Sequence, residues 1–385
     1  MRALARWVSI LLTTAAALAA ALVVVPPPVK RIAFLTIFVD DKTFVLIGAA
    51  LVAAALARAA GSRPWIVAQA AIALAIVAVS LVPPAQALRI AARRHVAIDF
   101  PRYFTAPVDD GAAHPSQTLV YAHVGGQALA LDVYRPTAPA GTRTPAVIVV
   151  HGGGWSADDK GGAPLMSAWL AAHGYAVFDV QYRIAPQPNW QTAIGDVKCA
   201  IGWVKRHARD VGVDVDPARV SLLGRSAGGH LVLLAAYDAD DPALPPSCDA
   251  GDTHVASVIS YYGPTDLVWG WEHPTNPRVF DVVQRLGNYV GGTPATEGAR
   301  FRLLSPINHV TAASPPTLLI QGGSDAFVSA PHAQMLADRL AAVGVPHDVL
   351  LVPYAQHAFD FISGGLGEQL AEHAVLRFLS PTGAR

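Results

Sequence analysis

The stretch GRSAG, Gly224–Gly228, follows the apolar run Val220–Leu223 and precedes a segment that reads as a helix through Ala236. A G-x-S-x-G pattern in this strand–turn–helix context predicts a tight turn that exposes the serine hydroxyl at the end of a sheet. The start of the helix also directs backbone N–H groups towards a reacting carbonyl. We therefore predict Ser226 as a nucleophile, the alternative being a purely structural turn.

A second glycine-rich turn, HGGGW at His151–Trp155, follows the apolar run Ala146–Val150. Glycines at the carboxyl end of a strand leave backbone N–H groups unshielded, which favours an oxyanion hole. The predicted donors are the N–H groups of Gly153, Gly154 and Ala227. A phosphate-binding loop is disfavoured, because no Gly-Lys-Ser/Thr follows and no G-x-G-x-x-G is suitably placed. His151 is expected to brace the loop by hydrogen bonds.

A base and an acid are predicted downstream of the serine. Among the downstream histidines, only His357 lies just beyond a clear strand, and Asp325 follows the run Thr317–Ile320. The resulting order of serine, acid and histidine is that of hydrolases with this turn. In such a triad Ser226 attacks, His357 accepts and returns its proton, and Asp325 fixes the imidazole tautomer. Asp360 is the alternative acid, although it is expected to be local to the following helix start.

The chain after the N-terminal region alternates between short β-rich runs and helical stretches. This alternation predicts an α/β protein with a mostly parallel sheet covered by helices on both faces. The predicted strands are Leu119–His123, Leu129–Tyr134, Ala146–Val150, Ala176–Val180, Val220–Leu223, Val255–Ser260, Thr317–Ile320 and Val349–Val352. Gly125-Gly126 marks a hairpin between the first two.

These motifs together resemble α/β-hydrolase carboxylesterases. The sequences that carry the resemblance are HGGGW with Asp159-Lys160, QYRIAP (181–186), DVK (196–198), GRSAGGHL (224–231), YYGPTD (261–266) and the Asp325/His357 pair. The closest groups are the hormone-sensitive-lipase-like esterases and the feruloyl and acetyl-xylan esterases. The resemblance covers about 119–379 and implies ester hydrolysis through an acyl-serine. Amidase, peptidase and acyltransferase chemistry can use the same triad and remain alternatives.

The first 87 residues hold most of the apolar excess of a chain that is 52% hydrophobic and only 15% charged. Apolar stretches at about 7–25, 43–59 and 65–82 predict three membrane helices, with two or four as alternatives. A cleaved signal peptide would explain the first run but not the other two. The segment Ile32–Val39 is too short to span and is placed at the interface. This organisation resembles actinobacterial membrane-attached lipase/esterases.

The boundaries predicted from composition are a transmembrane region at 1–87, a linker at 88–114 and a catalytic domain at 115–385. Counting Lys and Arg on each side of the membrane weakly favours a cytoplasmic catalytic domain. A short positive start before the first helix favours an N-terminus inside, which places the domain outside after three helices. We expect the catalytic domain on the extracytoplasmic side of the cell membrane.

Composition limits the partners. Lys+Arg and Asp+Glu both number 28, so the zero net charge gives no support to nucleic-acid binding. No H-E-x-x-H motif or cysteine–histidine cluster is present, and no metal or other cofactor is expected. Cys199 and Cys248 fit either a disulfide, which would suit an extracytoplasmic domain, or a buried thiol and a free one. The expected partners are the lipid bilayer and a small-molecule ester.

The sequence narrows the substrate only to broad classes of ester. Apolar residues between 265 and 305 form either a cap over the acyl pocket or a surface helix pair. Trp155, Trp190 and Tyr262 are expected to line the pocket. An apolar cap and membrane attachment favour a lipophilic acyl ester, whereas the family resemblance favours short acyl groups such as acetate.

Overall fold

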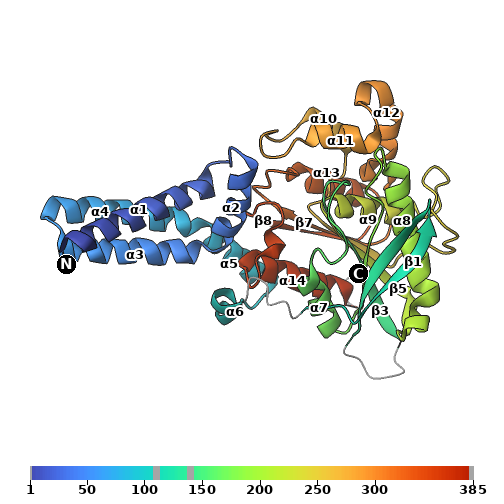
Figure 1. Ribbon diagram of the computed structural model, residues 1–385, viewed down its shortest axis with the longest axis horizontal. Helices are drawn as coiled ribbons and strands as arrows, with labels where there is room; N and C mark the ends of the chain where they lie inside the picture. The colour runs from blue at the N-terminus through green and yellow to red at the C-terminus, as the bar shows by residue number, and fades with distance from the viewer. Residues whose placement is uncertain (1, 107–112, 137–142, 381–385) are drawn as a thin grey trace.

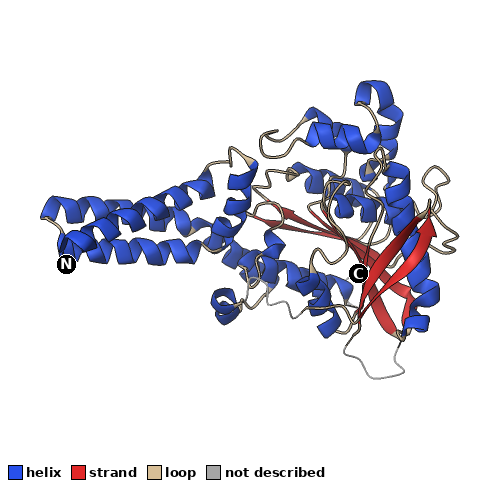
Figure 2. Ribbon diagram, viewed as in Figure 1, coloured by secondary structure: helices blue, strands red, loops and turns tan. Residues whose placement is uncertain are grey.

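The structure, a computed structural model, describes residues 2–106, 113–136 and 143–380. Its catalytic part is built on one eight-stranded sheet in the order β1-β2-β4-β3-β5-β6-β7-β8. Figure 2 shows the strands in red, with helices around them. The strands are β1 (Gln117–Val124), β2 (Gln127–Tyr134), β3 (Thr144–Val150), β4 (Ala176–Val180), β5 (Val215–Arg225), β6 (Ser257–Tyr261), β7 (Thr317–Gly322) and β8 (His347–Val352). β2 runs antiparallel to β1 and β4, and the pairs from β4 to β8 are parallel. The predicted mostly parallel sheet and all eight predicted strands are confirmed.

Helices cover both faces of this sheet, because its strands are apolar on both sides. Along β3, Ile148 and Val150 point into one core while Val147 and Val149 point into the other. The first core is closed by α8 (Trp190–His207), α9 (Ala227–Tyr237) and α13 (Pro331–Ala342), and the second by α7 (Pro164–Ala172) and α14 (Leu366–Leu379). Three further helices, α10 (Leu267–Glu272), α11 (Val282–Val290) and α12 (Pro294–Leu303), lie between β6 and β7 in the chain.

The N-terminal region forms a helical rod that projects from the catalytic domain (Figure 1). Its helices are α1 (Arg2–Val24), α2 (Lys30–Asp41), α3 (Thr43–Ala60), α4 (Arg63–Ser80) and α5 (Val82–Arg94). Three helical stretches, 2–24, 43–60 and 63–94, are long and apolar enough to cross a membrane. The third is longer than the predicted run 65–82, because Pro83 and Pro84 occupy the first turn of α5, where proline is tolerated.

The rod packs through small residues and a few polar contacts. Ala16, Ala20, Ala50 and Ala73 are buried where its helices meet, and Thr13 donates a 2.7 Å hydrogen bond to Gln69. Small residues and buried polar contacts of this kind are typical of helices that associate within a bilayer. The outward face carries exposed Leu, Val, Ile and Trp side chains, such as Trp7, Leu11 and Leu74.

Much of the segment predicted as a linker, 88–114, is helical in the structure. α5 extends into it as far as Arg94, which forms an ion pair with Asp348 at 2.7 Å, and α6 (Phe100–Thr105) follows. Apolar residues of α5 pack into the second core of the catalytic domain, so this part of the segment is a structural element of that domain. Residues 107–112 lie outside the described residues.

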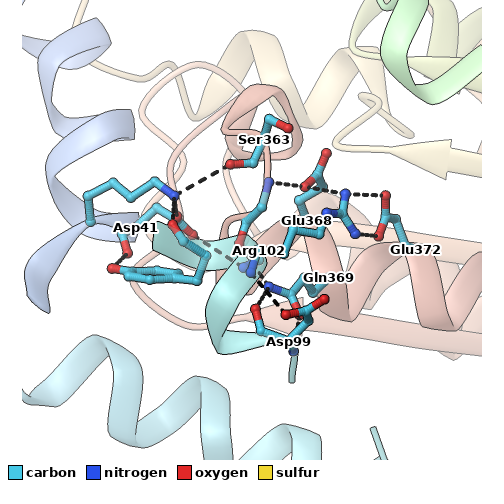
Figure 3. Close-up of polar contacts among 11 residues, drawn as sticks. Asp41, Asp99, Arg102, Ser363, Glu368, Gln369 and Glu372 are labelled. Carbon is cyan, nitrogen blue, oxygen red and sulfur yellow. Dashed lines mark hydrogen bonds and ion pairs between the residues drawn. The ribbon is translucent and has the colours of Figure 1, made fainter. Parts of the chain in front are cut away.

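A polar cluster joins the rod to the catalytic domain (Figure 3). From α6, the Arg102 guanidinium binds Glu368 at 3.0 Å and Glu372 at 2.5 Å on α14. Lys42, beside the carboxyl end of α2, donates to the Tyr103 carbonyl at 2.8 Å, and the Tyr103 hydroxyl donates to the Asp41 carbonyl at 2.7 Å. α2, α6 and α14 are therefore fixed to one another, and the rod has a defined placement on the domain.

Cys199 and Cys248 form a disulfide, one of the two alternatives left open by the sequence. Cys199 lies on α8 and Cys248 in the loop after α9, and their Cα atoms are 5.7 Å apart. Because α8 and α9 are packed side by side, the bridge ties the helix before the nucleophile strand to the loop that follows the nucleophile helix.

Candidate active site

Ser226 lies at the turn between β5 and α9 in a conformation that the neighbouring glycines permit. Its φ of 53° and ψ of −119° are in a region that residues with side chains rarely adopt. A Cβ on Gly224 would come within 2.2 Å of the Gly228 carbonyl oxygen, and one on Gly228 within 2.2 Å of the Val150 oxygen. The two glycines of the motif are thus required for the close passage of β3, β5 and α9 around the serine.

The three predicted triad residues meet at the carboxyl ends of β5, β7 and β8. His357 Nε2 is 3.0 Å from Ser226 Oγ, and His357 Nδ1 is 2.7 Å from Asp325 Oδ2. In this geometry Nδ1–H donates to the carboxylate, and Nε2 is left to accept the serine proton. A continuous chain of hydrogen bonds therefore joins Ser226 Oγ to His357 and His357 to Asp325.

Asp325 and His357 are each held from several sides. Asp325 Oδ1 accepts hydrogen bonds from the N–H groups of Phe327 and Val328 at 2.8 and 2.9 Å. The Phe327 ring stacks on the His357 imidazole with their centroids 5.0 Å apart, and the centroid of the Tyr262 ring lies 4.3 Å from that of the imidazole. These contacts restrict the carboxylate and the imidazole to the orientation that places Nε2 at Ser226.

The glycine-rich loop after β3 lies directly beside Ser226. Gly153 and Gly154 have φ of 94° and 59°, and a Cβ on Gly153 would collide with the Ala157 carbonyl oxygen. Among the hydrogen bonds of the described residues, none is donated by the N–H of Gly153 or Gly154. The N–H of Ala227 is at the first position of α9, where no intrahelical acceptor exists. Three donors near the serine are thus uncommitted.

His151 braces this loop through its ring and one nitrogen. Nδ1–H donates to the Gly152 carbonyl at 3.0 Å, and the ring stacks on Tyr182 at 4.3 Å. The Tyr182 hydroxyl donates to the same carbonyl at 2.9 Å. Burial lowers the pKa of His151, which favours the neutral ring required for this packing.

Asp360, the alternative acid, is engaged elsewhere. Its Oδ2 accepts from Arg225 Nε at 2.6 Å and its Oδ1 from the Tyr262 hydroxyl at 2.6 Å. The side chains of Arg225 and Asp360 are almost completely buried. Sequence reasoning missed this ion pair. The only signal for it was an arginine inside a motif that is otherwise buried among small residues.

A further contact, which the sequence analysis did not anticipate, joins the nucleophile helix α9 to Leu304 after α12 and to Trp155 of the glycine-rich loop. His230, one turn into α9, donates through Nε2 to the Leu304 carbonyl at 2.7 Å and accepts from Trp155 Nε1 at 3.3 Å. Burial lowers its pKa to about 4, so the ring stays neutral. Trp155 in turn stacks on Tyr289 of α11 at 4.5 Å.

Two cavities meet at Ser226. The smaller, of about 20 Å³, is largely apolar, and its walls include Trp155, Ala227, Leu267, Val282, Leu286 and Val328. The larger, of about 520 Å³, is lined by both charged and aromatic side chains, including Lys160, Asp179, Tyr262, Arg285, Phe327 and His357. Segment 265–305 thus supplies part of the small cavity through α10 and α11.

The three predicted pocket residues have different outcomes. Trp155 lines the small cavity and Tyr262 the large one. Trp190 lines neither of these two cavities. Its ring lies under the Arg300 guanidinium of α12, 5.4 Å away.

The eight-stranded sheet and the turn that carries Ser226 define the class of protein, an α/β hydrolase. The sequence model of the BD-FAE family matches residues 131–340, and the chain belongs to this family. The match begins within β2 and ends within α13, so it includes HGGGW, GRSAG and Asp325 but not His357.

Two similar proteins come from Mycobacterium tuberculosis (strain ATCC 25618 / H37Rv). The probable carboxylic ester hydrolase LipM is 34% identical over 275 residues, which are 68% of this chain and 61% of LipM. Esterase LipC is 35% identical over 261 residues, 65% of this chain and 61% of LipC. The matched region therefore spans about three fifths of these relatives.

Solved structures share the fold. The native structure of esterase Est2 from the Planctomycetes species Thermogutta terrifontis has a TM-score of 0.54 at 24% identity, covering 71% of this chain and 96% of that one. The apo form of Thermogutta terrifontis esterase 2 has a TM-score of 0.55 at 23% identity, covering 74% and 100%. At this identity the likeness concerns the fold alone.

Proposed function

We propose that the protein is a membrane-anchored serine carboxylic-ester hydrolase in which Ser226, His357 and Asp325 form the catalytic triad. The observation that carries this proposal is the continuous chain from Ser226 Oγ to His357 at 3.0 Å and on to Asp325 at 2.7 Å. Membership of the BD-FAE family and similarity to carboxylic ester hydrolases support the same reaction.

The proposed reaction follows from these positions. Ser226 Oγ attacks the ester carbonyl while His357 Nε2 takes its proton, and Asp325 stabilises the imidazolium that forms. The N–H groups of Gly153, Gly154 and Ala227 stabilise the negative oxygen of the tetrahedral intermediate. His357 then returns the proton to the leaving alcohol. Water, activated by the same imidazole, releases the acid and restores the serine.

The two cavities have different roles in this scheme. The leaving oxygen must receive its proton from His357 Nε2, so the alcohol occupies the large cavity, which His357 lines. The acyl group then enters the small apolar cavity, which His357 does not line. The small volume of that cavity favours short acyl groups over lipophilic long ones.

We expect hydrolysis of p-nitrophenyl esters of two to sixteen carbons to peak at two to four. Leu286→Ala should enlarge the acyl cavity and raise kcat/KM for the octanoate relative to the acetate by about tenfold. A difference of one methylene in how a substrate fills an apolar pocket already changes kcat/KM by about this factor. Val290→Ala, one turn away on α11 and buried outside the cavity, should leave the profile unchanged. A wild-type peak at long chains would contradict the acyl assignment.

We propose further that the catalytic domain lies on the extracytoplasmic side. The supporting observation is the disulfide between Cys199 and Cys248, since disulfides persist in oxidising compartments. A Gln127→Cys variant, placed at the exposed hairpin of β1 and β2, should react with a membrane-impermeant maleimide in intact cells. Reaction only after the cells are permeabilised would place the domain in the cytoplasm.

A further inference from the structure

The short helix α2 belongs to the membrane rod by sequence but contacts the catalytic domain. It lies between α1 and α3 in the chain and at the end of the rod nearest the domain (Figure 1). The Lys30 N–H donates to the Arg278 carbonyl at 3.2 Å, and the Asn276 amide donates to the Pro28 carbonyl at 3.3 Å. Ala33 is buried against Val279 and Phe327. α2 is therefore fixed to the segment that precedes α11.

The same helix forms part of the wall of the large cavity. Lys30 and Phe34 line it together with Ser226 and His357. The Phe34 ring lies 5.9 Å from the Phe327 ring, and Phe327 stacks on the imidazole of His357. Two consecutive ring contacts thus lead from the membrane rod to the catalytic base, although Phe34 is itself 54% exposed.

The position of α2 along the rod places this wall at the membrane surface. α1 ends at Val24 just before α2, and α3 begins at Thr43 just after it, so α2 lies where two spanning stretches end. Leu35 and Phe38 are apolar and about half exposed, on a helix that begins with Lys30 and Arg31. An exposed apolar face together with basic residues is typical of a helix lying in the interface.

We propose that the large cavity takes the alcohol part of its ester from the bilayer, so that the substrate is a small-acyl ester of a membrane-anchored lipid alcohol. This inference rests on the proposed ester hydrolysis and membrane anchoring. Hydrolysis gives a short carboxylic acid, which diffuses away, and a lipid alcohol, which stays in the membrane. The oxygen of the leaving alcohol receives its proton from His357. Phe34 would contact the chain of the alcohol where it leaves the bilayer.

The distribution of side chains in the cavity agrees with an amphiphilic alcohol. Asp158, Lys160 and Arg285 supply charge near the glycine loop, while Phe34, Phe280 and Phe327 supply aromatic surface towards α2. A substrate with a polar part near Ser226 and an apolar part towards the membrane would match this arrangement. A long acyl chain would instead have to fit the small cavity, whose walls include residues of α10 and α11.

The test uses full-length protein in proteoliposomes with two isomeric esters, oleyl acetate and ethyl oleate, and with soluble p-nitrophenyl acetate. Oleyl acetate carries its long chain on the alcohol and should be hydrolysed at least about tenfold faster than ethyl oleate, which carries it on the acyl group. Phe34→Ala should lower the ratio of kcat/KM for oleyl acetate to that for p-nitrophenyl acetate by about tenfold. Phe38→Ala is the matched control, because Phe38 is similarly exposed on α2 but does not line the cavity.

Equal ratios for Phe34→Ala and Phe38→Ala would overturn the inference, and so would preference for ethyl oleate. Rapid hydrolysis of p-nitrophenyl acetate with neither bilayer ester cleaved would identify a soluble alcohol as the substrate and leave the proposed esterase intact. Absence of serine-dependent hydrolysis of any of the three esters would instead contradict the proposed function itself.

Discussion

Replacement of Ser226 by alanine is expected to lower kcat for p-nitrophenyl acetate by about 10⁶-fold, the scale at which loss of a triad nucleophile is measured. No other hydroxyl is held 3.0 Å from His357 Nε2 in the part of the chain that the structure describes. The activity that remains would come from the N–H groups of Gly153, Gly154 and Ala227, which can still stabilise a negatively charged oxygen. The measurement is the steady-state rate of purified protein with each variant's thermal unfolding recorded alongside.

Ser324→Ala is the control for this variant. Ser324 is an exposed serine immediately before Asp325, and it is not a hydrogen-bond partner of the two ring nitrogens of His357, which pair with Asp325 and Ser226. It should retain wild-type kcat. A Ser226→Ala protein that is folded and keeps more than about a hundredth of wild-type activity would show that another group is the nucleophile.

Asp325→Asn is expected to lower kcat by about 10⁴-fold while leaving the fold intact. The carboxylate accepts Nδ1–H of His357 at 2.7 Å, whereas an asparagine amide can donate to Nδ1 and so favour the other tautomer. Nε2 would then carry the proton and could not accept one from Ser226. The measurement is kcat for p-nitrophenyl acetate across the pH range in which the variant stays folded.

Asp360→Asn separates the two candidate acids. Asp360 forms a buried ion pair with Arg225 at 2.6 Å, so neutralising it leaves the guanidinium without its partner and should destabilise the protein by about 3 kcal/mol. Activity of the folded protein should fall far less than for Asp325→Asn. If Asp360→Asn were inactive and Asp325→Asn active, the acid would be Asp360, and our assignment would be wrong.

Features set by local geometry could be predicted from the sequence. A Cβ on Gly153, Gly224 or Gly228 would collide with neighbouring backbone, and such a requirement is visible in the five consecutive residues of each motif. Continuous apolar runs such as Ala146–Val150 indicate strands buried on both faces, and all eight were found. His357 and Asp325 could be chosen because chain order and strand ends restrict the choice.

Features that depend on distant partners could not be predicted. Arg225 and Asp360 are 135 residues apart, and nothing near either one indicates the pair. Trp190 was expected in the pocket, but its ring lies under the guanidinium of Arg300, a residue 110 positions further along the chain (300 − 190). Ile32–Val39 was recognisable as a short apolar segment, yet its contact with Phe327 follows only from the placement of the rod on the domain.

The most direct test of the central claim is the intact mass of the protein, followed by peptide mapping, after treatment with an activated phosphonate ester. Such reagents react with a serine whose proton is removed by a neighbouring base. We predict one adduct, on Ser226, that is absent from Ser226→Ala and forms far more slowly on Asp325→Asn. An adduct on another residue, or no adduct on folded wild-type protein, would contradict the proposed serine hydrolase.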